Sequence, residues 1–296
     1  MFRKRITLLA PVLSREIDMF RMLFLIPLFV GVLPAAVAQE IAVPDQSESF
    51  HLFLLVGQSN MAGRGNVSDA DREVHPQVLM LNKQSKWVPA QDPMHFDKPK
   101  IVGVGLGRTF AIDYAAQHPG ITVGLIPCAV GGSPISAWAP GGFHPSTNTH
   151  PFDDAVPRAI LALQSGTLKG VLWHQGEGDS NATKAPAYEK KLHELIARFR
   201  KDLNAANVPF IAGQMGQFPE RPWNDARKMV DSVHRQLPAS VPYTAFVSSA
   251  GLNHRGDEVH FDSSSSREFG HRYFRAYQTL IKQTESKAAP AAPLPK

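Results

Sequence analysis

Short apolar runs alternate with helical segments along most of the chain, and this alternation constrains the fold more than any other feature. Runs rich in Val, Ile, Leu and Phe, typical of strands buried on both faces, span 50–57, 77–82, 121–127, 168–174, 208–214 and 242–248. Helical periodicity covers 106–117, 153–163, 186–203, 225–236 and 266–282. Strands that alternate with helices imply parallel β-α-β units. We therefore predict an α/β fold, a three-layer α/β/α sandwich with a central, mostly parallel sheet, in one domain over residues 48–283.

The start of the chain has the features of a cleavable secretory signal. Arg21 precedes an apolar stretch at 22–33, and small residues follow up to Ala38. We predict that residues 1–38 are the signal, cut after Ala38. A start at Met19 or Met22 would give a more usual signal length, so the first eighteen residues are expected to be an over-extended start. A retained membrane anchor is the alternative, but the apolar stretch is shorter than the roughly 20 residues that span a bilayer. The expected location is secreted or periplasmic, with no stable membrane insertion after cleavage.

Charge and cysteine content narrow the classes of partner. The full chain has 31 basic and 26 acidic residues, whereas the chain without residues 1–38 has 26 and 24, a net charge of +2. No basic stripe interleaved with aromatic residues remains, so we expect no nucleic acid partner. The single cysteine, Cys128, excludes an internal disulfide and a cysteine-built metal site. Residues 284–296 are rich in Pro and Ala and are predicted to be disordered; nothing in the sequence indicates the oligomeric state.

Ser59 follows the first predicted strand, in the segment Gly57-Gln58-Ser59-Asn60-Met61. In an α/β fold the chemistry is expected beyond the carboxyl ends of the strands. A serine at the start of a helical turn has a free N–H that can stabilise an anion, and the helix dipole favours negative charge there. The alternative is that Ser59 only caps a helix.

A pair of glycines, Gly131 and Gly132, follows the third predicted strand. Glycine lets backbone N–H groups turn outward and approach a ligand closely, which an oxyanion site requires. A simple tight turn is the alternative.

Polar residues crowd the end of the fourth predicted strand. The side chain of Gln175 could donate an N–H to an oxyanion, whereas Glu177 and Asp179 could order the loop by accepting backbone hydrogen bonds. We also weighed a metal site made of His174, Glu177 and Asp179, but no strong metal-ligand spacing supports it.

The segment before the last predicted helix pairs Asp257 with His260. A carboxylate three residues before a histidine in a turn can reach the imidazole Nδ1 and leave Nε2 facing a nucleophile. Such a pair often only caps a helix. Together with Ser59, however, it supplies a nucleophile, an acid and a base in the order Ser, Asp, His.

These segments together resemble a known superfamily. The segment around Ser59 lacks the G-x-S-x-G elbow of ordinary α/β-hydrolases. The chain instead resembles the SGNH-hydrolase superfamily, in particular carbohydrate esterase family 6 and sialate O-acetylesterase-like domains, including acetylxylan esterases. The resemblance covers about residues 50–280 and rests on GQSNMAGRG, GVGLGRTFAIDYAAQHPGITVGLIPCAVGGSPISAW, WHQGEGDS and DEVHF. This set, in this order, is highly specific.

The resemblance implies roles for individual residues. It makes Ser59 the nucleophile, His260 the general base and Asp257 its partner. The implied oxyanion donors are the N–H of Ser59, an N–H of Gly131 or Gly132, and the Gln175 side chain. Supporting positions would be Gln58, Asn60 and Glu177, the role of Glu177 being open. No metal or organic cofactor is implied.

The predicted function is that of an exported serine esterase. It would hydrolyse O-acetyl esters of carbohydrates, such as acetylated xylan or a related polysaccharide, through an acetyl-serine intermediate. Alternatives are a sialate O-acetylesterase and a non-catalytic carbohydrate-binding protein on the same fold. Pure binding would not require Ser59, Asp257 and His260 together.

Overall fold

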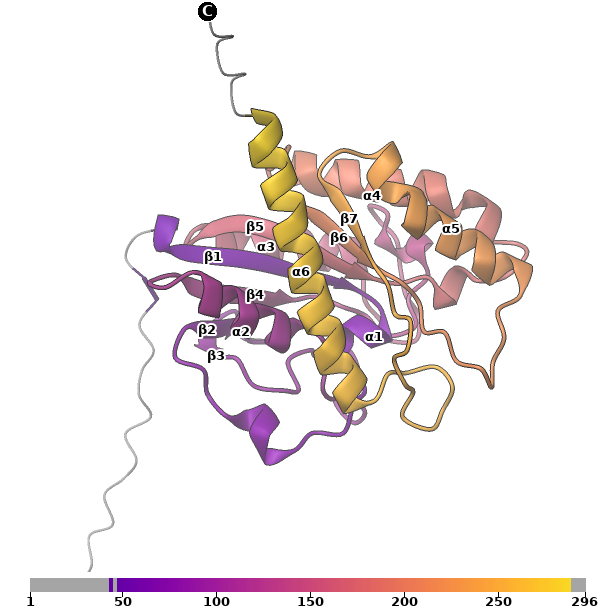
Figure 1. Ribbon diagram of the computed structural model, residues 1–296, viewed down its shortest axis with the longest axis horizontal. Coiled ribbons are helices and arrows are strands. Elements are labelled where there is room, and N and C mark those ends of the chain that lie inside the picture. Colours follow the sequence, from indigo (N-terminus) through magenta and orange to yellow (C-terminus); the bar gives the residue numbers. More distant parts are fainter. Residues whose placement is uncertain (1–42, 45–46, 289–296) are drawn as a thin grey trace, which may run out of the picture. The chain divides into compact units, whose positions relative to one another are not determined.

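A seven-stranded sheet runs through the computed structural model, which describes residues 43–44 and 47–288 (Figure 1). The strand order is β3-β2-β4-β1-β5-β6-β7. All neighbours pair in parallel except β3, which is antiparallel to β2 at one edge. The strands are β1 (Phe50–Gly57), β2 (Val78–Leu81), β3 (Trp87–Pro89), β4 (Thr122–Pro127), β5 (Thr167–His174), β6 (Phe210–Gly213) and β7 (Thr244–Val247).

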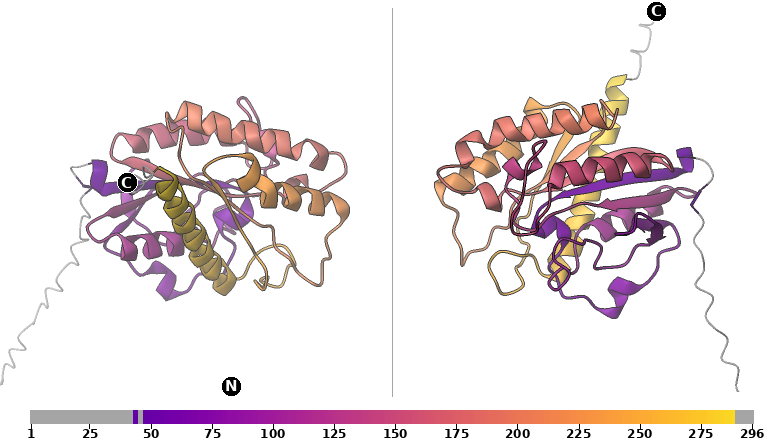
Figure 2. Two further views of the ribbon diagram at one scale, coloured as in Figure 1. Left: turned by 45° about the horizontal axis from the view of Figure 1, so that its top comes forward. Right: turned by 180° about the vertical axis from the view of Figure 1, so that it is seen from behind.

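Helices cover both faces of this sheet (Figure 2). The α-helices are α1 (Ser59–Ala62), α2 (Gly107–Gln117), α3 (Pro151–Leu163), α4 (Tyr188–Asp202), α5 (Asp225–Ser240) and α6 (Ser263–Ala288). Short 3-10 turns lie at Ser47–Ser49, Asp69–Arg72, Ile135–Trp138, Glu177–Asp179 and Ala185–Ala187. No helix within the described ranges is both long and apolar enough to span a bilayer.

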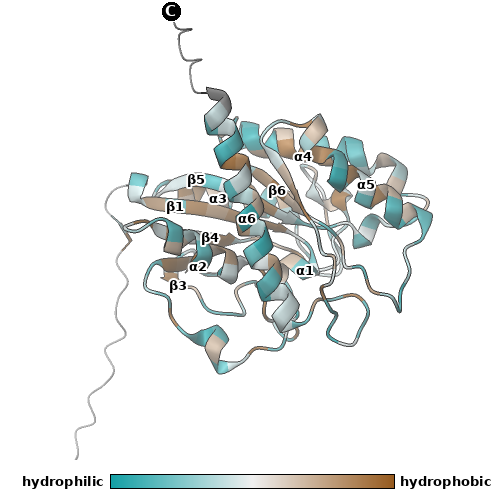
Figure 3. Ribbon diagram, in the orientation of Figure 1, coloured by the Kyte–Doolittle hydropathy of each residue, from teal (hydrophilic) through white to brown (hydrophobic). Residues whose placement is uncertain are grey.

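Alternation of side chains along the strands explains the three layers. In β1, Leu52 and Leu54 belong to the core under α3, α4 and α5, whereas Phe53 and Leu55 belong to the core under α2 and α6. Successive side chains of a strand point to opposite faces, so a strand that is buried on both sides must be apolar throughout. Figure 3 shows these central strands in the hydrophobic colours. The predicted three-layer α/β/α sandwich is confirmed.

The helices form where an apolar stripe recurs every three or four residues. In α4, Leu192, Leu195, Ile196 and Phe199 are buried on the side that packs on the sheet. The opposite side carries an ion pair between Lys190 and Glu194, one turn apart. The same alternation of buried and exposed positions made the helix detectable in the sequence.

Several boundaries differ from the predictions. Strand β3 was not predicted because it has only three half-buried residues at the sheet edge. Helix α1 was not predicted because four residues are too few for a period. Helix α6 runs to Ala288, so residues 284–288 are helical where the sequence predicted a disordered tail. The predicted signal, 1–38, lies outside the described residues.

The topology determines where a ligand can bind. The strands β4, β2 and β3 lie on one side of β1 within the sheet, and β5, β6 and β7 lie on its other side. The strand order therefore reverses at β1. The carboxyl ends of β4, β1 and β5 are therefore adjacent, with Leu55 paired to Pro127 and Gly57 paired to His174. In open α/β sheets the crevice at such a reversal of strand order is the usual ligand site.

Candidate active site

Ser59 lies at this reversal point, two residues beyond the end of β1. Gly57 has a φ of +123°, and a Cβ there would lie 2.1 Å from the carbonyl oxygen of His174, so the position requires glycine. The next N–H, that of Gln58, donates to the same oxygen at 2.8 Å. Ser59 is the first residue of α1 rather than its cap, and it is 6% exposed. Its own N–H has no partner among the described residues.

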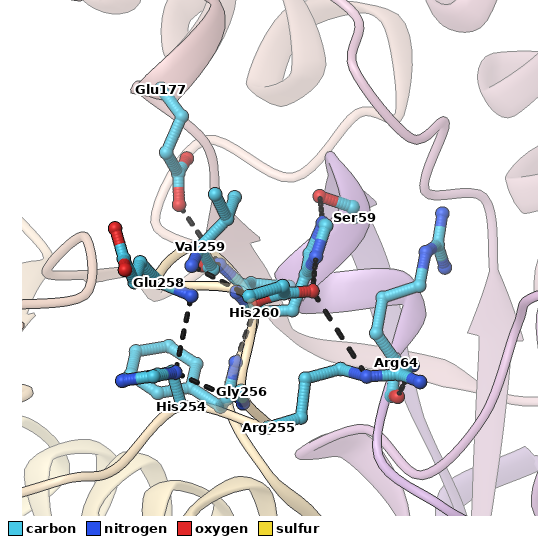
Figure 4. A network of polar contacts seen from close by, with 12 residues as sticks. Ser59, Arg64, Glu177, His254, Arg255, Gly256, Glu258, Val259 and His260 are labelled. Atoms are coloured by element: carbon cyan, nitrogen blue, oxygen red, sulfur yellow. Dashed lines mark hydrogen bonds and ion pairs between the residues drawn. The ribbon is translucent and has the colours of Figure 1, made fainter.

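His260, on the loop that precedes α6, points toward Ser59 (Figure 4), and Asp257 on the same loop contacts His260. The distance from His260 Nδ1 to Asp257 Oδ2 is 2.8 Å, and that from His260 Nε2 to Ser59 Oγ is 3.0 Å. The second oxygen of Asp257 accepts the backbone N–H groups of Val259 and His260, at 3.0 and 2.8 Å. These bonds fix the carboxylate against the imidazole. The structure thus brings together the serine, histidine and aspartate that the sequence singled out.

The electrostatics of this pair favour an ionised Asp257. Partial burial opposes the charge, but the backbone N–H and side chain of His260, together with the N–H of Val259, outweigh it and lower the pKa of Asp257. An ionised carboxylate accepts a hydrogen bond from the Nδ1–H group and so keeps the proton on that nitrogen. Nε2 is then left to accept the hydroxyl proton of Ser59.

Asn60 connects the serine to the histidine loop. Its Nδ2 donates to Glu177 Oε1 at 2.9 Å and to the carbonyl oxygen of Val259 at 3.1 Å. Its Oδ1 accepts the N–H of Phe261 at 3.2 Å. Gln58 plays a parallel part, since its Oε1 accepts the N–H of Gly178 at 3.3 Å. The three residues suggested as supports, Gln58, Asn60 and Glu177, all lie against the Ser59 turn or its neighbouring loops.

The two glycines after β4 have different surroundings. The N–H of Gly131 donates to Asp97 Oδ2 at 2.7 Å, and a Cβ at Gly131 would lie 2.3 Å from Arg64 Nη2. Gly132 is exposed, with a φ of +84°, and its N–H has no partner within the part of the chain that the structure describes. The Gly131 N–H is therefore occupied, and that of Gly132 is free to bind a ligand.

Gln175 does not have the free amide that an oxyanion donor needs. Its Nε2 donates to the carbonyl oxygen of Ser133 at 3.2 Å and to Asp179 Oδ2 at 2.6 Å. Its Oε1 accepts the hydroxyl of Tyr188 at 2.8 Å, and the residue is fully buried. An amide NH₂ has two donors, and both are occupied. This corrects the expectation for Gln175, because here the side chain joins the end of β5 to its neighbours.

Sequence reasoning missed a buried ion pair beneath this site. Arg64 and Asp97 are joined at 2.8 Å with 3% and 1% of their side chains exposed. Arg255 Nη1 donates to the carbonyl oxygen of Arg64 at 2.5 Å, and its Nε lies 4.0 Å from Asp257 Oδ2. Arg64 stands in the GQSNMAGRG segment and could have been noticed, whereas Asp97 lies 33 residues away in a segment without a motif.

The proposed metal ligands are not arranged around a common point. His174 is buried, and its Nε2 lies 3.0 Å from the carbonyl oxygen of Gln214, to which it donates. Burial is the largest cause that lowers its pKa, so the ring is neutral. Within residues 43–44 and 47–288, no group of three or more His, Cys, Asp or Glu side chains could hold a metal ion.

The chain is similar to known carbohydrate esterases over most of its length. Residues 49–279 match the family described as carbohydrate esterase, sialic acid-specific acetylesterase. A probable carbohydrate esterase of Arabidopsis thaliana is 29% identical over 247 residues, which are 76% of this chain and 89% of that protein.

Solved structures share the fold. The X-ray structure of an Arabidopsis thaliana protein has a TM-score of 0.68 and 27% identity, covering 77% of this chain and 98% of that one. NanS has a TM-score of 0.65 at 17% identity, covering 80% and 99%. A carbohydrate acetylesterase from Xanthomonas citri has a TM-score of 0.61 at 21% identity, covering 78% and 57%. With its fold, its serine, histidine and aspartate in contact, and a family match over most of its length, this chain belongs to the carbohydrate esterase, sialic acid-specific acetylesterase family.

Proposed function

We propose that the protein hydrolyses O-acetyl esters of carbohydrates through an acetyl-serine intermediate on Ser59. The observation that carries the proposal is the continuous line of contacts from Asp257 through His260 to Ser59, at 2.8 and 3.0 Å. Nucleophilic catalysis by serine requires a base within hydrogen-bond reach and a third group that orients this base.

The reaction has two balanced steps. In the first, Ser59 Oγ bonds to the acetyl carbon while its proton passes to His260 Nε2, and the collapsing tetrahedral intermediate releases the sugar oxygen, which takes that proton. In the second, His260 removes a proton from water, whose oxygen attacks the carbonyl carbon of acetyl-Ser59. Acetate leaves, and the proton returns to Ser59 Oγ. Asp257 remains ionised and stabilises the imidazolium form of His260 in both steps.

The N–H groups of Ser59 and Gly132 are our choice for the oxyanion donors. Both lack a partner within the described ranges, and they stand at the adjacent carboxyl ends of β1 and β4. The ion pair of Arg64 and Asp97 holds the preceding N–H of Gly131 and so keeps this turn fixed. Donors that are already oriented stabilise the developing charge without reorganisation.

The substrate we propose is acetylated xylan or a related polysaccharide. A cavity of about 720 Å³ is lined by Ala129 and Val130, which precede the glycine turn, and by Phe96, Thr147 and Thr149, whereas Ser59, His260 and Asp257 are not part of its lining. This volume is within the range of sites that hold a whole small ligand, far larger than an acetyl group needs. An acetylated sialic acid is the second candidate, favoured by the description of the family. Export by the predicted signal, with action in the periplasm or outside the cell, is part of the same proposal.

Release of acetate by matched variants tests the proposal. Initial rates on acetylated xylan and on an O-acetylated sialic acid are compared for the wild type, for Ser59→Ala and for Ser240→Ala, which alters an exposed serine at the end of α5. We expect Ser59→Ala to lower kcat by about 10⁴-fold or more, while Ser240→Ala keeps the wild-type rate. Equal turnover by the wild type and Ser59→Ala would contradict the proposal. Failure of the wild type on every acetyl sugar would favour the carbohydrate-binding alternative.

A further inference from the structure

A small polar cavity of about 180 Å³ adjoins the candidate active site. One of its walls is Val259, which stands between Asp257 and His260 in the chain. A second wall is Glu177, which accepts a hydrogen bond from Asn60, the residue after the serine. The cavity therefore touches the residue before His260 directly and is connected to the residue after Ser59 through Glu177.

Arg227 supplies unused hydrogen-bond donors to this cavity. The residue is only 7% exposed, yet its Nε and Nη2 are buried without a partner. Its guanidinium lies over the ring of Trp223, at 5.7 Å from the ring centre. Buried guanidinium donors are normally paired, and unpaired ones cost free energy. Their position is explained if a ligand with acceptor atoms supplies the missing bonds.

The position of Arg227 along its helix is also unfavourable for stability alone. It stands in the first turn of α5, where its backbone N–H donates to the cap Asn224 at 2.8 Å. The amino end of a helix carries partial positive charge, so a cation there is repelled and an anion is attracted. The guanidinium and the helix end thus favour the same kind of occupant.

The charges around the cavity do not balance. Arg221 is exposed, and its side chain makes no hydrogen bond or ion pair within the described ranges, while Glu177 is the carboxylate in the lining. One oxygen of Glu177 is used by Asn60, and the other is buried without a bond. Burial is the largest cause that lowers the pKa of Arg227, Glu177 opposes this, and Arg221 adds to it. Two guanidinium groups facing one carboxylate leave a net charge of +1.

We propose that Arg227 and Arg221 bind a carboxylate carried by the acetylated glycan, so that the esterase acts preferentially on acidic sugars. A carboxylate brings one negative charge and two acceptor oxygens, which match the net charge and the planar fork of a guanidinium. This inference rests on the proposed function, because the cavity lies beside the serine that would attack the ester. The carboxylate belongs either to a hexuronic acid or to a nonulosonic acid, which share this chemistry.

Matched substrates that differ only in charge test the subsite. An O-acetylated methyl glucuronoside is compared with its carboxamide, and an O-acetylated sialoside with its carboxamide. For the wild type at low salt, we expect KM to be about tenfold lower for the acid than for the amide in at least one pair. The pair that shows the difference identifies the source of the carboxylate.

Variants of the two arginines assign the effect to the cavity. Arg227→Gln and Arg221→Gln should each bring the acid and amide KM values to within about twofold of each other. Lys228→Gln is the matched control, because it removes one positive charge from the neighbouring position of α5, on a side chain that is 64% exposed. It should keep the tenfold preference. Arg221 is exposed, so Arg221→Gln is informative even where Arg227→Gln does not fold.

The outcomes separate this inference from the proposed function. If the wild type releases acetate from the amides but shows no preference for the acids, the subsite is absent while the esterase activity stands. If no acetyl sugar is hydrolysed, calorimetry with unacetylated glucuronate, sialate and their amides on the Ser59→Ala protein still measures the subsite. Tighter binding of an acid that Arg221→Gln abolishes would then support the subsite alone. Equal binding of acid and amide would overturn it.

Discussion

Two carboxylates that accept backbone N–H groups on the loops beyond the strand ends, Asp179 and Asp257, have opposite properties. Asp179 Oδ2 accepts the N–H of Ile135 at 2.7 Å and the amide of Gln175 at 2.6 Å, and the residue is 1% exposed. Asp257 accepts hydrogen bonds from two backbone N–H groups and from the ring Nδ1–H of His260, and its side chain is 41% exposed. Burial raises the pKa of Asp179 despite its hydrogen bonds, whereas hydrogen bonds lower that of Asp257.

The comparison shows that burial, more than the identity of the partners, distinguishes a carboxylate that holds the structure together from one that orients the proposed catalytic histidine. In the first region the amide of Gln175 is satisfied on all sides, and Tyr188 in turn contacts His234 Nε2 at 2.9 Å. Such a network stabilises one arrangement, and both N–H groups of the Gln175 amide are used within it. In the second region the imidazole of His260 contacts a serine and is partly open to solvent.

Of the variants in these two regions, Asp257→Asn should have the largest effect on catalysis, with almost none on stability. An asparagine no longer holds the Nδ1–H form of His260 by charge, so we expect kcat to fall by about 10⁴-fold. The free energy of unfolding should change by less than about 1 kcal/mol, because the carboxylate is well exposed. Steady-state kinetics and urea unfolding measure the two quantities.

The matched control for this variant is Asp225→Asn, which alters an exposed carboxylate in the first turn of α5. It should have wild-type kcat. A kcat for Asp257→Asn within threefold of the wild type would remove Asp257 from the proposed mechanism.

Gln175→Ala should have the opposite profile. Truncation leaves Asp179, the carbonyl of Ser133 and the hydroxyl of Tyr188 each with one bond fewer in a buried site. We expect a loss of about 2–4 kcal/mol in the free energy of unfolding, since buried polar groups without partners are costly. The folded fraction should keep most of its activity, because Gln175 has no free N–H for the oxyanion. Urea unfolding, with rates normalised to folded protein, measures both.

Tyr188→Phe sharpens this test, because it removes one hydroxyl from the same network and leaves the active site unaltered. It should destabilise in the same direction by about 1 kcal/mol. If Gln175→Ala were stable and lost 10²-fold or more in kcat, the amide would after all act on the oxyanion.

The pH dependence of stability should give the smallest and most specific difference. The pKa of Asp179 is raised above 3.8 in the fold, so the folded protein binds more protons than the unfolded chain above about pH 4. The contribution of Asp179 to the free energy of unfolding therefore falls as the pH rises through the raised pKa. Asp257 behaves oppositely: its contribution is present above about pH 4 and is lost in acid.

Asp179→Asn should therefore become more stable relative to the wild type as the pH rises from 4 to 8. Melting temperatures of the two proteins across this range measure the trend, and the constant offset from lost or altered bonds does not affect it. A difference that is independent of pH would show that Asp179 titrates in the fold as it does in the unfolded chain.

Much of the fold was predictable because the signals are local and repeated. All six predicted strands form from short apolar runs, and most of their residues are buried, although Ala245 and Phe246 of the edge strand β7 are only half-buried. The five predicted helices also form, with ends that shift by a few residues because a helix boundary depends on capping contacts. Strand β3 and helix α1 escaped prediction because neither is long enough for a pattern of buried and exposed positions to repeat.

The site was partly predictable for a different reason. Asp257 and His260 are three residues apart, so their contact is local and the sequence could indicate it. The contact of His260 with Ser59 spans 201 residues and was inferred from the resemblance of the whole motif set. The difference between Gly131 and Gly132 could not be inferred, because it depends on Asp97, which a separate loop brings beneath the turn.

The sequence by itself determined the layers of the sheet, the order of the strand ends along the chain and the residue types that carry the chemistry. Periodicity and motifs are properties of neighbouring residues, and they do not require contacts to be known. The tertiary structure alone decided which polar groups are buried and already paired, and which stay free. It placed the Gln175 amide inside a buried network and left Nε and Nη2 of Arg227 without partners. Burial and pairing depend on elements that are distant in the chain, so no local pattern contains them.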